Sequence, residues 1–287
     1  MNQLAFIPTM QPTLVDEVPG GSDWIHEIKY DGYRTQLVID NERVRAFTRN
    51  GNDWTSKYGP IVEDARALEC RSAILDGEIA VQDDHGVTDY PALLRSIASA
   101  PHRLVFFAFD LLHLDGEDLR QAPLEERRAR LRWLLRQPPG QIRMSDEYTG
   151  EGAAFFAIAD RLGLEGVVSK RKGSRYTSGA SRAWLKIKCW HTDTFEVIGI
   201  QRDREGIPYA LLANEGEYRG TAMISLPNAL RSAFWRLVDE HTTPSPPNGF
   251  RRSGVTWVQP GMRATVRHLK GAGKLRHASV KDVLVEQ

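Results

Sequence analysis

The stretch from Ile25 to Arg34, Ile-His-Glu-Ile-Lys-Tyr-Asp-Gly-Tyr-Arg, constrains the fold more than any other part of the chain. Its apolar residues suit a half-buried β-strand, and Asp31-Gly32 favours a turn directly afterwards. Lys29 is therefore predicted to lie at a strand end, with an acid and an arginine close behind it. A nucleophilic lysine needs such a setting, because an amine reacts only when desolvation or neighbouring cations lower its pKa. An ordinary strand lysine that points to water fits this stretch equally well, so the rest of the chain must decide.

Further short motifs follow, each expected at a strand end or turn. They read Thr-Arg-Asn-Gly at 48–51, Asp-Gly-Glu at 76–78, Phe-Ala-Phe-Asp-Leu at 107–111, Glu-Gly-Val-Val-Ser-Lys at 165–170 and Leu-Lys-Ile-Lys at 185–188. With Lys29–Arg34 at their head, these motifs resemble, in family order, those of the covalent nucleotidyltransferases: DNA ligases, RNA ligases and mRNA capping enzymes. The sequence of Glu27–Arg34 most resembles that of ATP-dependent DNA ligases of the bacterial end-joining type. The resemblance covers nearly the whole chain. Each motif alone is common, so the resemblance is specific because all the motifs occur together and in the family order.

The resemblance implies an ATP-dependent DNA ligase that seals a 3′-hydroxyl to a 5′-phosphate through a lysyl-AMP and a DNA-adenylate. Each step is an in-line phosphoryl substitution, so the protein mainly positions groups and neutralises charge. Lys29 would be the nucleophile, and Glu165 would bind Mg²⁺ or Mn²⁺. The residues that would hold the nucleotide are Glu27 beside the adenine, Arg34 on the ribose or phosphate, Arg49 on the nucleotide, Glu78 on the ribose hydroxyls, Phe109 stacked on the adenine, and Lys186 and Lys188 at the α-phosphate with Arg182 close by.

Each of these residues also has a simpler explanation. Phe109 in an apolar strand suits a hydrophobic core, and Glu78 after a turn suits a solvated carboxylate. Lys186 and Lys188, which alternate with apolar residues, suit the exposed face of an amphipathic strand. Taken together, however, the set supplies a nucleophile, an aromatic platform, ribose acceptors, a metal-binding acid and phosphate cations, and chance explains this combination poorly.

The composition is that of a soluble globular protein, with 41% hydrophobic and 26% charged residues. Its 287 residues suffice for two domains. The net charge of +1 does not by itself predict a polyanionic partner, so a nucleic-acid surface must come from local clusters. Two cysteines are too few for a disulfide framework or a zinc site, and no signal peptide or membrane-spanning run is recognisable. We therefore expect a cytoplasmic monomer with no membrane association.

Clusters of basic residues indicate where nicked duplex DNA would bind. The candidates are Lys170, Arg171, Lys172 and Arg175 around a loop expected at 170–181, and Arg276 near the C-terminus. Such clusters suit phosphate backbones, although scattered solubilising charge explains any one of them. A Ku-like end-binding protein is a further candidate partner.

The chain is predicted to be α+β, with a nucleotidyltransferase (ligase adenylation) domain at 1–190 and an OB-fold β-barrel at 191–287. Helical spacing predicts helices at 61–68, 93–98, 124–136 and 151–162, and the arginines of the third are expected to form a solvated face. After residue 191, short strands separated by turns surround one helix at 230–240, which is typical of an OB-fold.

The C-terminus departs from the family pattern. Residues 275–282 resemble the start of its final segment, but the usual Arg-x-Asp-Lys, which orients the pyrophosphate, is not recognisable before Gln287. Either Arg276 with Lys281 takes that role, or self-adenylation is weak. One alternative is an RNA ligase or a capping-type nucleotidyltransferase, since both share Lys-x-Asp-Gly. Another is a catalytically weak nucleic-acid-binding relative, which the altered C-terminus favours.

Overall fold

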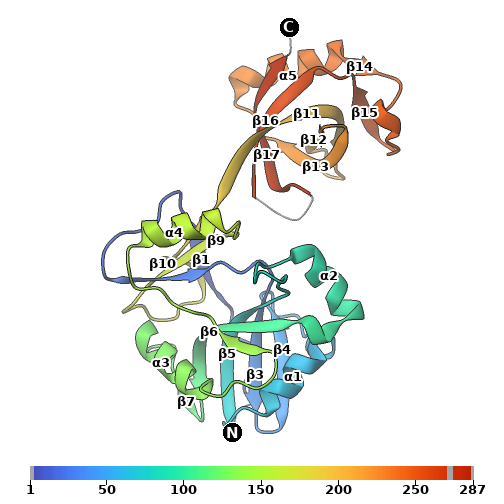
Figure 1. Ribbon diagram of the computed structural model, residues 1–287. Helices are drawn as coiled ribbons and strands as arrows, with labels where there is room; N and C mark the ends of the chain where they lie inside the picture. The colour runs from blue at the N-terminus through green and yellow to red at the C-terminus, as the bar shows by residue number, and fades with distance from the viewer. Residues whose placement is uncertain (1–2, 270–273, 286–287) are drawn as a thin grey trace. The chain divides into compact units, whose positions relative to one another are not determined.

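The computed structural model describes residues 3–269 and 274–285. Contacts between Cα atoms divide the chain into two compact units, Met1–Cys189 and Trp190–Gln287 (Figure 1).

The first unit contains two β-sheets. The larger has the order β4-β3-β5-β6-β7, with β8 beside β6, and the smaller has the order β1-β10-β9-β2. The larger sheet consists of β3 (Tyr33–Asp40), β4 (Arg43–Thr48), β5 (Ser72–Ala80), β6 (Val105–Leu114), β7 (Glu117–Asp118) and β8 (Ile142–Met144). The smaller consists of β1 (Met10–Leu14), β2 (Trp24–Ile28), β9 (Gly166–Arg171) and β10 (Gly179–Lys188). The six motifs from Lys29–Arg34 to Leu185–Lys188 lie in one of these sheets or directly beside it.

The larger sheet is buried on both faces. Because successive side chains of a strand point to opposite faces, Leu37 and Ile39 enter one hydrophobic cluster and Val38 enters another. The helices of this unit are α1 (Gly59–Arg66), α2 (Tyr90–Ser99), α3 (Leu124–Leu134) and α4 (Gly152–Arg161). α3 packs against β6, and α4 packs against β9 and β2 (Figure 1).

The expectation that the arginines of the third helix form a solvated face is wrong for two of them. Leu124 and Leu131 of α3 are buried as its apolar spacing predicts, and Glu125 and Glu126 occupy its first turn. Arg127 and Arg128 are buried as well, at 0% and 1% exposure, so they are not part of a solvated face.

The second unit is built mainly from strands. They are β11 (Trp190–Arg202), β12 (Pro208–Asn214), β13 (Glu217–Ile224), β14 (Thr242–Thr243), β15 (Val255–Val258), β16 (Met262–Leu269) and β17 (Arg276–Val285), with one α-helix among them, α5 (Asn228–Glu240). β11 pairs with β12 and β16, β12 with β13, β13 with β17, and β17 with β16. Phe234 of α5 packs into the core of this unit with Val197 and Val266.

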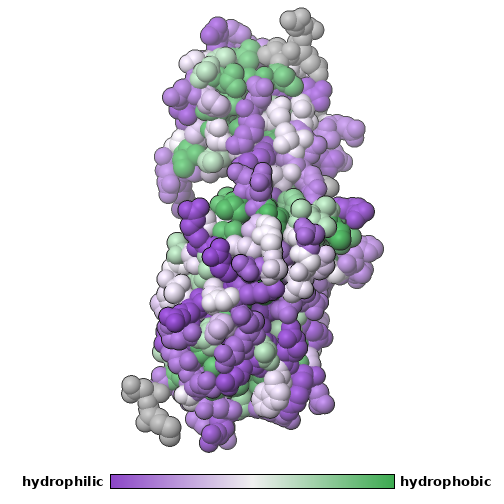
Figure 2. All heavy atoms as spheres, turned by 90° about the vertical axis from the view of Figure 1, so that its left-hand side faces the viewer, coloured by the Kyte–Doolittle hydropathy of each residue, from purple (hydrophilic) through white to green (hydrophobic). Residues whose placement is uncertain are grey.

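The predicted helices are confirmed to within a few residues. The expected loop at 170–181 is shorter in the structure, because Lys170 and Arg171 belong to β9 and residues 179–181 belong to β10. Hydrophilic side chains dominate the face drawn in Figure 2. Within the described part of the chain, no helix has the length and apolar character needed to cross a membrane.

Candidate active site

Lys29 directly follows β2, and its backbone continues the pairing with β9, because its N–H donates to the carbonyl of Gly166 at 2.9 Å. Its Nζ lies 2.6 Å from Oε2 of Glu165, and the two side chains are 21% and 5% exposed. Gly32 explains the Asp-Gly of this motif, since a Cβ there would lie 2.1 Å from the carbonyl oxygen of Ile79. The close approach of the Gly32 backbone to β5 therefore fixes the turn that follows the lysine.

Further cations surround Glu165. Nζ of Lys188 lies 3.6 Å from its Oε1. Burial lowers the pKa of Lys188 and of Lys186, the charge of Lys29 lowers both further, and Glu165 opposes the shifts. The charge of Arg49 also lowers the pKa of Lys186, so Arg49 acts on the same cluster of cations. Lys186 and Lys188 are two positions apart on β10 and so share a face.

Glu78 faces this cluster from the larger sheet. In the strand register it lies opposite Arg34 on one side and Phe107 on the other. Burial raises the pKa of Glu78 to about 8, against the opposing charges of Lys29 and Arg34. A carboxyl group of this kind can both donate and accept hydrogen bonds near neutral pH, and a hydroxyl group can pair with it in either role.

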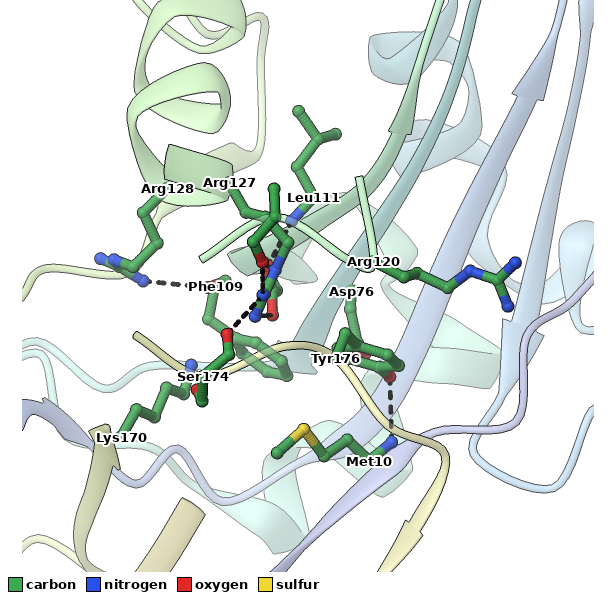
Figure 3. Close-up of polar contacts among 12 residues, drawn as sticks. Met10, Asp76, Phe109, Leu111, Arg120, Arg127, Arg128, Lys170, Ser174 and Tyr176 are labelled. Atoms are coloured by element: carbon green, nitrogen blue, oxygen red, sulfur yellow. Dashed lines mark hydrogen bonds and ion pairs between the residues drawn. The ribbon is translucent and has the colours of Figure 1, made fainter. Parts of the chain in front are cut away.

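Arg34 is held by other parts of the protein. Its Nε and Nη2 donate to the two carboxylate oxygens of Asp76 at 3.1 and 2.7 Å, and its Nη1 donates to the carbonyl of Met10 at 2.6 Å. Tyr176 donates to Asp76 at 2.6 Å and accepts from the N–H of Met10 at 3.0 Å (Figure 3). The expected contact of Arg34 with the nucleotide thus remains a prediction, and the structure gives the residue a bidentate partner instead.

Phe109 lies among cations and a second aromatic ring, and Figure 3 shows it beside Lys170. Nζ of Lys170 is 4.2 Å from the ring centroid, Cζ of Arg34 is 5.3 Å away, and the ring of Trp184 meets it edge-on at 6.0 Å. Glu27, the other expected adenine residue, is joined to Phe109 through Lys170, whose Nζ donates to its carboxylate at 2.9 Å.

The prediction that Lys170 contacts DNA is wrong. It is 2% exposed and ion-paired with Glu27, so it is not a surface cation available to a phosphate backbone. Arg171 and Arg175 are exposed, and the Lys172 ammonium donates to the carbonyl of Ser22 at 2.5 Å.

The last two predicted residues lie on strands, one in each unit. Arg182 is exposed on β10, and no described contact joins it to Lys29 or Glu165. Arg276 lies on β17 of the second unit, opposite Leu269 of β16.

A divalent metal fits Glu165 in the way the resemblance implies. Among the described residues there is no group of three or more His, Cys, Asp or Glu side chains that could enclose an ion. Mg²⁺ commonly binds through one or two carboxylates together with substrate phosphates and water, so a single buried glutamate such as Glu165 suits it.

Sequence reasoning missed the polar side chains behind the site. Arg127 holds Asp110 by two hydrogen bonds of 2.8 Å, and Arg128 holds Glu27 at 2.8 Å (Figure 3 shows both arginines). Their position between Leu124 and Leu131 on the apolar side of the helix is a signal that could have revealed them.

Comparison with known proteins identifies the family. Residues 7–188, more than half of the chain, match the model of the ATP dependent DNA ligase domain. A multifunctional non-homologous end joining protein LigD from Pseudomonas aeruginosa is 39% identical over 189 residues, which is 65% of this chain and 22% of that protein. The LigD of Mycobacterium bovis is 33% identical over 275 residues, which is 90% of this chain and 36% of that protein. The chain thus spans only a fifth to a third of the length of these relatives.

Solved structures agree with this assignment. The ligase domain of LigD from Mycobacterium tuberculosis is 28% identical, with a TM-score of 0.58 and coverage of 96% of this chain and 94% of that one. A mycobacterial DNA ligase D complexed with ATP has the same identity, a TM-score of 0.56 and coverage of 96% and 95%. A Lig E DNA ligase reaches a TM-score of 0.64 at 17% identity, with coverage of 96% and 99%, and supports the fold alone. The chain belongs to the ATP-dependent DNA ligase domain family.

Proposed function

We propose that this chain uses ATP to seal 3′-hydroxyl/5′-phosphate nicks in duplex DNA through an adenylated Lys29. The observation that carries the proposal is the cluster in which the Lys29 amine meets Glu165, with Lys188 on the other carboxylate oxygen. It unites a nucleophile, an acid suited to a metal and phosphate cations, and it does so in a chain of the ligase family.

In the first step, Nζ of Lys29 attacks the α-phosphorus of ATP. A nitrogen–phosphorus bond forms, the bond to the bridging oxygen breaks, pyrophosphate leaves, and the amine loses its proton. Lys186 and Lys188 neutralise charge on the α-phosphate, which is the main contribution a protein makes to such a substitution. Phe109 stacks on the adenine, Glu78 binds the ribose hydroxyls, and Glu27, Arg34, Arg49 and Arg182 complete the nucleotide site.

Glu165 would hold the divalent metal, Mg²⁺ or Mn²⁺. When bound, the ion supplies positive charge to the phosphate oxygens during bond exchange. The AMP then passes to the 5′-phosphate of the nick, and the 3′-hydroxyl displaces it to form the phosphodiester.

Residues 191–287, which lie in the second unit, are proposed to form an OB-fold that helps to hold DNA, with the adenylation domain at 1–190. The series of pairings that leads from β11 through β12, β13, β17 and β16 back to β11 supports this proposal. Arg171, Lys172, Arg175 and Arg276 are the proposed phosphate contacts, and their binding should weaken as salt is raised.

The relatives named for non-homologous end joining suggest a role in the repair of broken ends, with a Ku-like protein as partner. Co-purification of this chain with the Ku-like protein of its own genome, with and without linear DNA, tests that part. An absence of association in both conditions would remove the partner from the proposal.

The nick-sealing proposal itself is tested with a labelled, singly nicked duplex, ATP and Mg²⁺ or Mn²⁺, followed on a denaturing gel. Sealed product with DNA and ATP, and none with GTP, is expected. Preferential sealing of an RNA nick would favour the RNA ligase alternative, and labelling by GTP would favour a capping-type enzyme. DNA binding without sealing would favour the inactive relative, in line with the atypical C-terminus.

A further inference from the structure

Arg128 of α3 makes hydrogen bonds to four separate groups. Its Nη1 donates to Oε1 of Glu27 at 2.8 Å and to the carbonyl of Phe109 at 2.9 Å. Its Nη2 donates to the carbonyl of Ser145 at 2.8 Å, and its Nε donates to Oε2 of Glu147 at 2.5 Å. The side chain is 2% exposed, so these bonds are shielded from water and hold the guanidinium in one place.

The partners of Arg128 lie on both sheets of the first unit. Glu27 belongs to β2 of the smaller sheet, while Phe109 belongs to β6 of the larger. Glu27 also binds Lys170 of β9, whose ammonium lies over the Phe109 ring. The guanidinium therefore links, by direct hydrogen bonds, the two residues proposed to meet the adenine base from different sheets.

No other side-chain type reproduces this link. A guanidinium is a rigid planar fork with five N–H donors, whereas an ammonium is a point charge with three donors on a flexible stem. Lysine at this position would keep the charge beside Glu27 and lose at least part of the fork that reaches the Phe109 and Ser145 carbonyls. Glutamine would also leave Glu27 with less positive charge around a buried carboxylate.

We propose that Arg128 is a positioning residue that fixes the spacing between Phe109 and Glu27, and with it the width of the adenine site. The inference rests on the proposed function, because it assumes that adenine binds beside these two residues. None of the described contacts of Arg128 is to Lys29, Glu165, Lys186 or Lys188. Arg128 thus acts on base binding rather than on the phosphate that reacts.

The test is the rate of covalent labelling of Lys29 as a function of ATP concentration in Arg128→Lys and Arg128→Gln. We expect KM for ATP to rise about tenfold, which corresponds to the loss of one charged hydrogen bond, with kcat within about threefold of wild type. The matched control is Arg132→Gln. Arg132 lies on the same helix and also binds Glu147, at 2.9 Å, but it is 57% exposed and does not touch Glu27.

The split between KM and kcat separates positioning from a merely structural role. A variant that is only less stable contains less active protein, so its labelling amplitude falls while its KM stays at the wild-type value. An unchanged KM in folded Arg128→Lys and Arg128→Gln, or an equal rise in Arg132→Gln, would overturn the inference. If Arg128→Gln does not fold, Arg128→Lys decides alone. Wild-type protein that carries no AMP by mass and that ATP does not label would instead overturn the proposed function.

Discussion

Oε2 of Glu165 lies 2.6 Å from Nζ of Lys29, so the proposed metal-binding acid and the proposed nucleophile form an ion pair with each other. Glu165 comes directly before β9 and Lys29 directly after β2, and these strands are neighbours in the smaller sheet. Two residues far apart in sequence are therefore placed together by strand pairing. A divalent cation that binds Glu165 would therefore compete with the lysine for this carboxylate.

Replacement of Glu165 tests that relationship. Glu165→Gln keeps the shape of the side chain but removes the charge that attracts both Lys29 and a metal. Adenylation of Lys29 should slow by about 100-fold or more, because the positive charge of the metal that Glu165 would hold near the reacting phosphate is lost. The measurement is single-turnover labelling with ATP and Mg²⁺, and the control is Glu151→Gln, which changes an exposed acid. Equal rates in both variants would exclude a role for Glu165 in this step.

The buried pair of Asp110 and Arg127 predicts a large loss of stability. Both side chains are 0% exposed, so Asp110→Asn leaves a buried guanidinium without its counter-charge. The free energy of unfolding should fall by about 3–5 kcal/mol. Glu117→Gln, which breaks the exposed pair with Arg130, should cost less than about 1 kcal/mol. Urea denaturation measures both, and similar losses would contradict the assigned burial.

The sequence predicted the strands and helices well wherever the hydrophobic period was regular. Helix α1 is an example, because Ile61, Val62 and Ala65 recur at helical spacing and all three are buried. The prediction from sequence was wrong for Arg127 and Arg128, because arginine is usually exposed. Their carboxylate partners, Asp110 and Glu27, come from strands distant in the sequence. A charged side chain is buried only where the fold brings an opposite charge next to it, and the periodicity of one sequence does not show which residues the fold brings together.

Tyr176 provides a second stability test. Its buried hydroxyl bridges Asp76 and the N–H of Met10. In Tyr176→Phe both groups lose this partner, and the free energy of unfolding should fall by about 1–3 kcal/mol. Tyr148→Phe, at a residue 38% exposed, should change it by less than about 0.5 kcal/mol. Chemical denaturation of the two variants under the same conditions gives the comparison, and a Tyr176→Phe protein as stable as wild type would count against the bridge.

Glu78 predicts a pH dependence of stability. Burial raises its pKa from 4.5 to about 8, so in this interval the folded state holds a proton that the unfolded state has lost. The contribution is fully present below pH 4.5 and is lost as the pH rises through 8. The free energy of unfolding of wild type should therefore decline relative to that of Glu78→Gln between these limits. Denaturation curves at several pH values measure the difference, and a constant difference would show that the pKa is not raised.

Within the site, the sequence predicted which residues meet but not how they are held. The motif order placed Lys29, Glu165, Lys186 and Lys188 in one set, and the structure brings these four together. Lys170 was assigned to the DNA surface because it stands beside Arg171 and Lys172. The strand alternation of β9 turns its side chain into the interior instead, where Glu27 neutralises it.

The most direct test of the whole account is covalent labelling of the protein with α-labelled ATP and Mg²⁺ or Mn²⁺, beside Lys29→Ala and a GTP arm. The account predicts labelling by ATP alone and its complete loss in Lys29→Ala. If the protein is not labelled, its mass is measured by mass spectrometry, because AMP already attached to Lys29 would also prevent labelling. Protein that carries no AMP and takes up none, or a label that persists in Lys29→Ala, would contradict the assignment of Lys29 as the nucleophile.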